Sequence, residues 1–356
     1  MLFNQICLGD PMGTFAYSNK ILCFGELLLR LSPIGHERIE QTSGLQVYYD
    51  GAEAMVAIDL AHQGENVAYA SCISDNRIAD RGLMNLLGAG VDVTRVTRRP
   101  GRMGLFFFER GAGERRSTVI YDREHTPITM LKRSDFDWDS LLNGIDSFYF
   151  SGIVPAINKE MRLAVEDALI ACKGRGVKTY CDLNYRPRMW NRAIAHDTWE
   201  RLLPYVDVCI ASDEDIWSIF PRPNVNPDRT TTFSYLDYYQ DIAAELSELF
   251  NCEAVAIEIR SLASSGIGRW RGLLMHNGET TLSVAREVMN DEHSGCGDSF
   301  AAGIIHGIRR GWESSTIINY ALTSSALKST IPGSINHLSS EEIVAAVGSK
   351  LSIVDY

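Results

Sequence analysis

The chain has 356 residues, enough to bury the core of one large domain or of two modest ones. Hydrophobic residues make up 45% and charged residues 22%, as in an ordinary soluble globular protein. The formal net charge of -11 argues against a nucleic-acid-binding protein, which usually carries a basic face. No apolar run reaches the roughly 18 residues that a membrane span needs. We therefore expect a globular protein that binds neither nucleic acid nor membrane.

The N-terminus and the cysteines favour a cytoplasmic location. Residues 1–19 lack the basic start and the sustained apolar core of a secretory signal, and are interpreted as an extension before the first strand. None of the eight cysteines forms a C-x-x-C pair, which argues against a zinc or redox motif. Cys23, Cys181 and Cys209 lie in apolar runs, where a thiol behaves as a small hydrophobe.

Short apolar strands alternate with helical stretches along the chain. The predicted strands are residues 21–25, 67–71, 147–150, 178–182 and 206–210, and two of the predicted helices are residues 52–63 and 80–87. This alternation predicts an α/β fold with a mostly parallel sheet and helices on both faces.

Three segments break the alternation. Residues 26–50 and 101–123 alternate polar and apolar residues with aromatics, which predicts antiparallel strands outside the main sheet. Residues 221–236 are rich in turn-forming residues, as in Pro221-Arg222-Pro223-Asn224, and are interpreted as a surface insertion. No linker divides the chain convincingly.

A glycine-rich turn, Ser294-Gly295-Cys296-Gly297-Asp298, opens a predicted helix. The apolar face of this helix is formed by Phe300, Ile304, Ile305 and Ile308. Such a turn leaves backbone N–H groups at the positive end of the helix dipole, where they can hold a developing phosphate charge. Asp298 is placed to take a proton from an attacking hydroxyl. The alternative is an ordinary aspartate at a helix start.

This segment resembles the C-terminal signature of the ribokinase-like (PfkB) carbohydrate kinases, D-T-x-G-A-G-D-x-F. Here Glu292-His293 replace the leading Asp-Thr, and Cys296 replaces the central Ala. The resemblance implies that Gly295, Cys296 and Gly297 form the anion hole and that Asp298 is the catalytic base. It also implies a three-layer α/β/α sandwich over residues 20–345, with a β-lid from residues 26–50 and 101–123. Since such lids often pair between subunits, a homodimer is expected, as are the cofactors ATP and Mg²⁺.

Four stretches are similar to those of 2-keto-3-deoxygluconate kinases: residues 50–57, 121–123, 182–190 and 326–334. The substrate-binding residues implied by this resemblance are Gly51, Phe106, Tyr121, Arg123, Arg186 and Asp298. The nucleotide-side residues are Asn184, Arg186, Ser212, Gly295, Gly297 and Ser334, and Asp215 is a candidate for a magnesium site reached through water.

These residue types suit a sugar acid, because a guanidinium can donate two parallel hydrogen bonds to its carboxylate. Alternatives from the residues alone stay open. Arg123 and Arg186 could be solvated surface arginines with packed stems. Tyr121 could be a strand aromatic and Gly51 an ordinary turn glycine. We expect Lys328 to be exposed.

An alternative also stays open for Ser212 and Asp215, since an acidic run after a strand is usually a helix start.

For Cys296 we expect a reactive thiol. A thiol at a helix N-terminus should have a lowered pKa and raised reactivity.

Several positions depart from the pattern of these kinases. Asp50 stands where Gly is usual, Met55 where a sugar-binding Asn is usual, and Phe106 where Tyr is frequent. Residues 256–268 replace the more common strand and G-x-x-G segment on the adenine side. These departures bear on sugar specificity and leave the catalytic loop in place.

The expected function is ATP-dependent phosphorylation of a sugar acid, with 2-keto-3-deoxygluconate as the leading substrate. One alternative is a kinase for fructose, ribose, another sugar or a nucleoside. Another is a kinase-fold binding protein with weakened turnover, for which the changes at Met55 and Ser212 argue.

Overall fold

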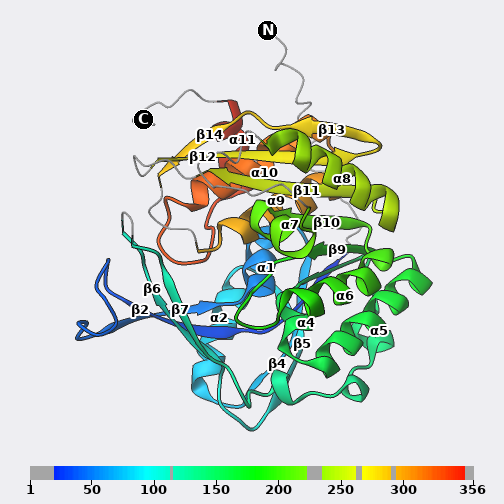
Figure 1. The fold of residues 1–356 in the computed structure, drawn as a ribbon. Coiled ribbons are helices and arrows are strands. Elements are labelled where there is room, and N and C mark those ends of the chain that lie inside the picture. Colours follow the sequence, from blue (N-terminus) through cyan, green and yellow to red (C-terminus); the bar gives the residue numbers. More distant parts are fainter. Residues whose placement is uncertain (1–19, 113–114, 223–234, 262–266, 290–293, 349–356) are drawn as a thin grey trace.

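The main sheet forms the centre of the molecule in this computed structural model, which describes residues 20–112, 115–222, 235–261, 267–289 and 294–348 (Figure 1). Its strands run in the order β13-β12-β11-β10-β9-β8-β1-β4-β5, and β14 pairs with β12. The strands are β1 (Ile21–Phe24), β4 (Val67–Ser74), β5 (Asp92–Arg99), β8 (Ser147–Ser151), β9 (Lys178–Asp182), β10 (Val208–Ser212), β11 (Ala254–Ser261), β12 (Ile267–His276), β13 (Glu279–Leu282) and β14 (Arg286–Met289).

Every neighbouring pair from β5 to β11 in that order is parallel, and β12 is antiparallel to β11, β13 and β14. Apart from β5 at the sheet edge, the parallel strands are buried on both faces, as a sheet covered by helices on each side requires. In β1, Leu22 and Phe24 pack in one core, and Ile21 and Cys23 pack in the other. The predicted α/β/α sandwich is therefore confirmed.

The helices divide between the two faces. The core on one face is packed by α4 (Ile153–Ile157), α5 (Lys159–Arg175), α6 (Arg192–Leu202), α7 (Asp213–Ile219) and α8 (Leu236–Phe250), with α3 (Trp138–Leu141) at its edge. The other core is packed by α1 (Ala52–His62), α2 (Arg77–Gly88), α9 (Cys296–Arg309) and α10 (Ser314–Lys328), and α11 (Ser340–Gly348) lies against α10. Short 3₁₀ turns are η1 (Ile128–Met130), η2 (Arg133–Asp135) and η3 (Leu203–Tyr205).

Helix α2 shows how local chemistry sets a boundary. The sequence predicts a helix from residue 80, but α2 begins at Arg77 because the Asn76 side chain accepts hydrogen bonds from the N–H groups of Ile78 and Ala79. Asparagine is among the best N-cap residues, so this cap was the available signal for the earlier start.

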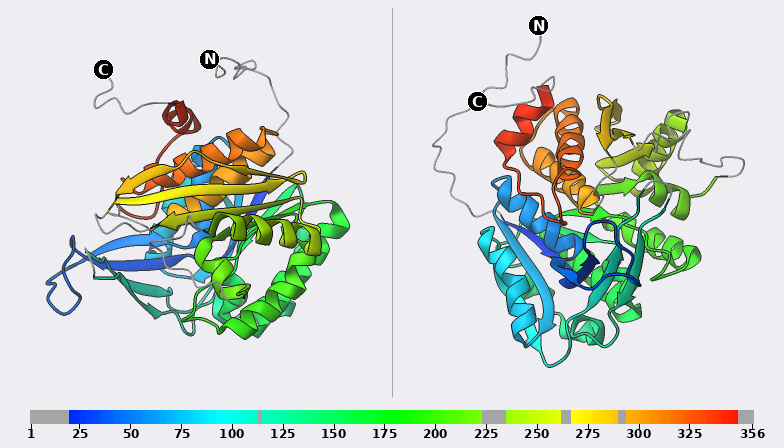
Figure 2. Two further views of the ribbon diagram at one scale, coloured as in Figure 1. Left: turned by 45° about the horizontal axis from the view of Figure 1, so that its top comes forward. Right: turned by 90° about the vertical axis from the view of Figure 1, so that its left-hand side faces the viewer.

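A second sheet, the lid, projects from one end of the main sheet (Figures 1 and 2). Its order is β3-β2-β6-β7, from β2 (Leu28–Pro33), β3 (Leu45–Asp50), β6 (Leu105–Glu109) and β7 (Thr118–Asp122). These strands lie in the two predicted segments. The expected antiparallel strands are confirmed in the pairs β2–β3 and β6–β7, whereas the central pair, β2 and β6, is parallel. No hairpin joins these two strands, since α1, β4, α2 and β5 intervene in the chain.

Three expectations concern residues that lie wholly or partly outside the described parts of the chain. The N-terminal extension at residues 1–19 and residues 223–234 of the predicted insertion lie outside the described residues. Residues 254–261 and 267–276 form β11 and β12, so the departing segment near residue 260 is strand except for residues 262–266, which are not described. No helix in the described parts of the chain is long and apolar enough to span a membrane.

Candidate active site

Helix α9 begins with an open N-terminus. Its N-cap, Gly295, has a φ of 79° and makes no side-chain cap hydrogen bond to the first turn. A Cβ on Gly295 would lie 2.0 Å from the carbonyl oxygen of Ser334, so both the backbone angle and the close approach require glycine. Because first-turn N–H groups have no acceptor within the helix, those of α9 are available to an anion.

Asp298 lies in the first turn of α9 and is partly buried. Burial and the neighbouring carboxylates of Asp50 and Asp59 raise its pKa well above the ordinary value, and Arg186 opposes this shift. Among the described residues, none donates a hydrogen bond to its carboxylate. A carboxylate with a raised pKa and a free oxygen beside an anion site has the properties of a general base.

More carboxylates lie nearby, at the ends of β9 and β10. Burial raises the pKa of Asp182 well above its ordinary value, and repulsion from Asp215 and Asp298 raises it further. The positive charge of Arg186, which is exposed, lowers the pKa of both Asp182 and Asp298. The fold thus brings together residues from the two most informative motifs, 182–190 and 294–298.

The turn after β9 holds Asn184 in an unusual conformation. Its φ is 38°, in the left-handed region, and its backbone N–H donates to Asp182 Oδ1 at 3.2 Å. Asparagine tolerates this region better than most residues. Asn184 is nearly fully buried at this turn, next in the chain to the half-buried Tyr185 and the exposed Arg186.

Helix α1 also begins at a glycine without a side-chain cap. Gly51 has a φ of 139°, and a Cβ there would lie 2.2 Å from the carbonyl oxygen of Glu26. Glycine is required here because no other residue fits this close approach to the protein's own backbone. Met55, in the next turn, is fully buried in the core and offers no hydrogen bond to a sugar.

A buried arginine that the sequence reading missed, Arg30 of β2, connects the lid to the start of α9. Its Nη1 donates to Ser294 Oγ at 2.5 Å and to Ser334 Oγ at 2.9 Å, and lies 3.7 Å from Asp50 Oδ2. The Ser334 hydroxyl also donates to Asp50. Asp50, a departure from the family pattern, thus neutralises Arg30, and the hydroxyl of Ser334 is engaged within the protein.

Strand register places the other lid residues beside Arg30. Tyr48 and Phe106 are its direct neighbours on β3 and β6, and Tyr121 pairs with Phe106 on β7. The rings of Phe106 and Tyr121 lie 6.0 Å apart. Because directly paired residues share one face of a sheet, this row forms the side of the lid that faces the α9 loop through Arg30.

Comparison with known proteins decides the family. The pfkB family carbohydrate kinase profile matches residues 18–246. The chain belongs to this family. As a member, it is a carbohydrate kinase.

Three relatives illustrate the likeness. The 2-dehydro-3-deoxygluconokinase of Thermotoga maritima is 37% identical, with a TM-score of 0.86 over 93% of this chain and 98% of that one. The 2-dehydro-3-deoxygalactonokinase of Haloferax volcanii is 28% identical over 91% of this chain and 95% of its own length. A ribokinase II candidate from E. coli, in complex with ATP and Mg²⁺, shares the fold at 19% identity, with a TM-score of 0.76 over 92% of this chain and 99% of that one.

In this kinase Arg123 is buried, so the alternative of a solvated surface arginine is wrong for it. Its guanidinium forms an ion pair with the buried Glu26, which follows β1, and its Nη1 lies 3.1 Å from the sulfur of Met189. Glu26 also accepts a hydrogen bond from Thr126 Oγ1 at 3.0 Å. Glu26 was not identified from the sequence, although a glutamate directly after a buried strand was a signal.

Burial bears on two expectations for the kinase, those for Lys328 and Cys296. Lys328 is not exposed: it is fully buried, and its Nζ donates to the carbonyl oxygens of Ile331 and Gly333 at 2.9 and 2.8 Å. It thereby holds the loop that carries Ser334. Cys296 is also fully buried, in a small cluster that includes Trp270, so its thiol is shielded from reagents and the expected reactivity is not supported.

The start of α7 is a capping box. Ser212 Oγ accepts from the N–H of Asp215 at 3.2 Å, and Asp215 Oδ2 accepts from the N–H of Ser212 at 2.8 Å. Asp215 Oδ1 accepts from the N–H of Tyr185 at 2.6 Å. Both oxygens of Asp215 are therefore engaged, which suits a role through water better than direct ligation. The nearby carboxylates are the hard oxygen donors that Mg²⁺ prefers, and a divalent cation would relieve their mutual repulsion.

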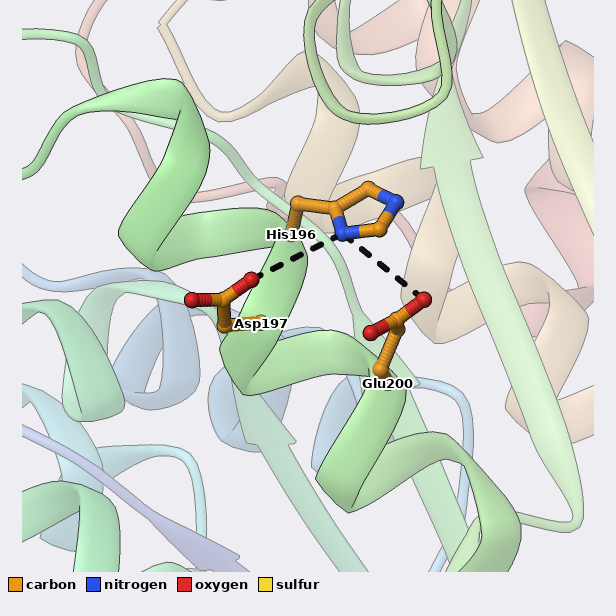
Figure 3. Close-up of side chains that lie close together, drawn as sticks. All are labelled: His196, Asp197 and Glu200. Carbon is orange, nitrogen blue, oxygen red and sulfur yellow. Dashed lines mark ion pairs between the residues drawn. The ribbon is translucent and has the colours of Figure 1, made fainter.

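A separate group on α6 does not belong to this site. His196 Nδ1 lies 3.9 Å from Asp197 Oδ1 and 3.8 Å from Glu200 Oε1 (Figure 3). The two acids are exposed. Exposed acidic groups beside a histidine are common on helices, and no further feature there indicates a metal centre.

Proposed function

We propose that this kinase transfers the γ-phosphoryl group of ATP to the primary hydroxyl of a 2-keto-3-deoxy sugar acid, with 2-keto-3-deoxygluconate as the leading substrate. The observation that carries the proposal is the glycine N-cap of α9, Gly295, with Asp298 in the first turn of the helix. The names of the T. maritima and H. volcanii relatives support a substrate of this class.

Asp298 accepts the proton of the sugar hydroxyl. The hydroxyl oxygen then attacks the γ-phosphorus, and the bond from this phosphorus to the bridging oxygen breaks, so that ADP leaves with the electron pair. The N–H groups of Gly295, Cys296 and Gly297 stabilise the charge on the phosphoryl oxygens. Positioning and electrostatics supply most of the rate in such reactions.

On the nucleotide side, we assign Asn184, Arg186, Ser212 and Ser334 to the surroundings of the phosphates. The Ser334 hydroxyl acts on the phosphate site indirectly, because it holds Arg30 and Ser294 in place. Magnesium would supply positive charge against the nucleotide phosphates, and Asp215 would help to hold it through water.

On the sugar side, Gly51 allows the backbone at the start of α1 to approach the substrate closely. Phe106 and Tyr121 cover the sugar from the lid. Arg123 and Arg186 bind its carboxylate, since guanidinium groups donate paired hydrogen bonds to carboxylates.

Asp298→Asn tests the base. We expect kcat to fall by about 10²–10⁴-fold, the usual cost of losing a general base, while thermal stability is kept. Asp237→Asn is the matched control, because Asp237 is an exposed acid in the first turn of α8. Near-normal turnover of Asp298→Asn would remove Asp298 from the mechanism.

A screen of ADP release tests the substrate. The panel contains 2-keto-3-deoxygluconate, 2-keto-3-deoxygalactonate, fructose, ribose and a nucleoside, and the first two should give the highest kcat/KM. Preference for a neutral sugar would establish the alternative kinase. Sugar binding without turnover would establish the alternative of a kinase-fold binding protein with weakened turnover. The buried Met55, at a position where a sugar-binding Asn is usual, is the reason to test this alternative.

A further inference from the structure

A second arginine, Arg260, lies beside the glycine loop of α9. It stands near the carboxyl end of β11, where Ser212 of β10 pairs with Glu258 of β11. The nearest heavy atom to a Cβ built on Gly297 would be Nη2 of Arg260, at 3.9 Å. Among the described residues, no other side-chain atom lies within 4 Å of that Cβ position. The cation therefore lies against the anion site.

The guanidinium of Arg260 is held in a fixed orientation. Its central carbon lies 4.4 Å from the ring centroid of Trp270, its direct neighbour on β12. Its Nη2 forms an ion pair with Glu258, whose other oxygen accepts from Ser325 Oγ at 2.5 Å. The Nε atom of Arg260 is buried and makes no hydrogen bond to the described residues. Such an arginine is preorganised, because little side-chain freedom is left to lose.

Arg30 and Arg260 differ in what their charges can do. Arg30 is almost fully buried and bonded to Ser294 and Ser334, so it supports the loop from within. The side chain of Arg260 is 23% exposed, and among the described residues it forms an ion pair with one carboxylate, that of Glu258. Arg260 can therefore bind a further anion, which Arg30 cannot do without breaking its present contacts.

We propose that Arg260 contacts the phosphoryl group in transfer, together with the N–H groups of α9. This inference rests on the proposed function and adds a catalytic side chain to it. As the bond between the γ-phosphorus and the bridging oxygen breaks, negative charge grows on the leaving oxygen of ADP and on the equatorial oxygens. A fixed guanidinium beside Gly297 stabilises this charge more in the transition state than in the ground state.

The competing role for Arg260 is structural. Glu258 is buried, and a buried carboxylate needs a counter-charge. Loss of Arg260 alone would then impair the enzyme without any contact to phosphate. The double variant Glu258→Gln with Arg260→Gln separates the two roles, because it removes the buried carboxylate and its partner together.

The experiment compares wild type, Arg260→Gln, Arg260→Lys and the double variant, with the best substrate of the wild-type enzyme. We expect Arg260→Gln to lower kcat about 10²-fold, as for the loss of one oxyanion donor, with the sugar KM near wild type. Lysine should restore part of the rate. The double variant should stay as slow as Arg260→Gln. Arg77→Gln, an exposed arginine at the start of α2, is the control and should leave kcat unchanged.

Recovery of wild-type kcat in the double variant would overturn the proposal, as would normal kcat in Arg260→Gln. Calorimetric titration with ATP and AMP in the presence of Mg²⁺ gives a second readout. Arg260→Gln should bind ATP more weakly than wild type and should bind AMP with unchanged affinity. Equal ATP affinities of wild type and Arg260→Gln would also count against the proposal. If wild type phosphorylates no sugar in the panel, the proposed function fails, but the titration still decides the role of Arg260.

Discussion

Arg123 is already paired with a carboxylate in the absence of substrate. Its partner Glu26 and the arginine are both nearly inaccessible to solvent. Removing one member of a buried ion pair leaves the other charge uncompensated, so truncation of Arg123 has a cost that is unrelated to any ligand. A test of Arg123 as a carboxylate-binding residue must separate this general cost from the specific one.

Comparison of two substrates achieves this separation. Arg123→Ala should lower kcat/KM for the sugar acid at least about tenfold more than for a neutral analogue, because a charge-assisted hydrogen bond is worth about 1.5–3 kcal/mol. The cost of leaving Glu26 unpaired affects both substrates and cancels in the ratio. Arg102→Ala, at an exposed arginine paired with Asp122, is the control. Equal losses for acid and neutral sugar would show that Arg123 does not read the carboxylate.

Asp59 connects three elements around the site. It lies in α1, accepts a hydrogen bond from Ser299 Oγ of α9 at 2.6 Å, and accepts another from the N–H of Asn336 at 3.2 Å. Burial raises its pKa from 3.8 to about 8, although the hydrogen bond from Ser299 lowers it. The folded protein therefore keeps a proton on Asp59 that the unfolded chain releases.

This difference predicts a pH dependence of stability. Between about pH 4 and 8 the folded state binds one more proton than the unfolded state, so the free energy of unfolding falls as the pH rises. Asp59→Asn can keep both hydrogen bonds and does not titrate. Its melting temperature relative to wild type should therefore increase from pH 5 to pH 8.5.

Asp241→Asn, at an exposed acid of α8, is the control for Asp59→Asn and should give no such trend. Melting temperatures measured at several pH values check the prediction. A constant difference between Asp59→Asn and wild type over this range would show that Asp59 is ionised in the folded protein.

The overall fold could be predicted because its signals are local. Each buried parallel strand is a short apolar run, as in residues 147–150, and the helices between them have their own apolar period. The glycine loop was visible because close backbone approaches exclude other residues, as at Gly295. The parallel pairing of β2 and β6 could not be predicted, since it depends on the path of the whole chain between them.

The partners of buried charges could not be predicted either. Arg30 meets Ser294 and Ser334 only after folding, across separations of more than 260 residues. Lys328 has the sequence surroundings of an exposed helix end, but the following turn brings two carbonyl oxygens to its ammonium group. The free-energy cost of desolvating these buried charges is offset by contacts that no sequence pattern shows.

The lid has a second face, on the side opposite Arg30. Register places Val47, Leu31, Phe107 and Ile120 in one row across β3, β2, β6 and β7, on the face opposite Arg30. Val47 is 57% exposed and Ile120 is 47% exposed. An apolar row across a whole sheet is the kind of surface that marks an interaction site. We propose that it pairs with the same row of a second copy, so that the kinase is a homodimer through the lid.

Charge on this row tests the dimer. Ile120→Glu should convert the dimer to monomer in sedimentation velocity experiments, because two copies would bury two unpaired carboxylates against apolar neighbours. Ile170→Glu is the matched control, since Ile170 lies on α5 and is also 47% exposed. It should remain dimeric. A monomeric wild-type protein at micromolar concentration, or equal dissociation in both variants, would show that the lid row is not the interface.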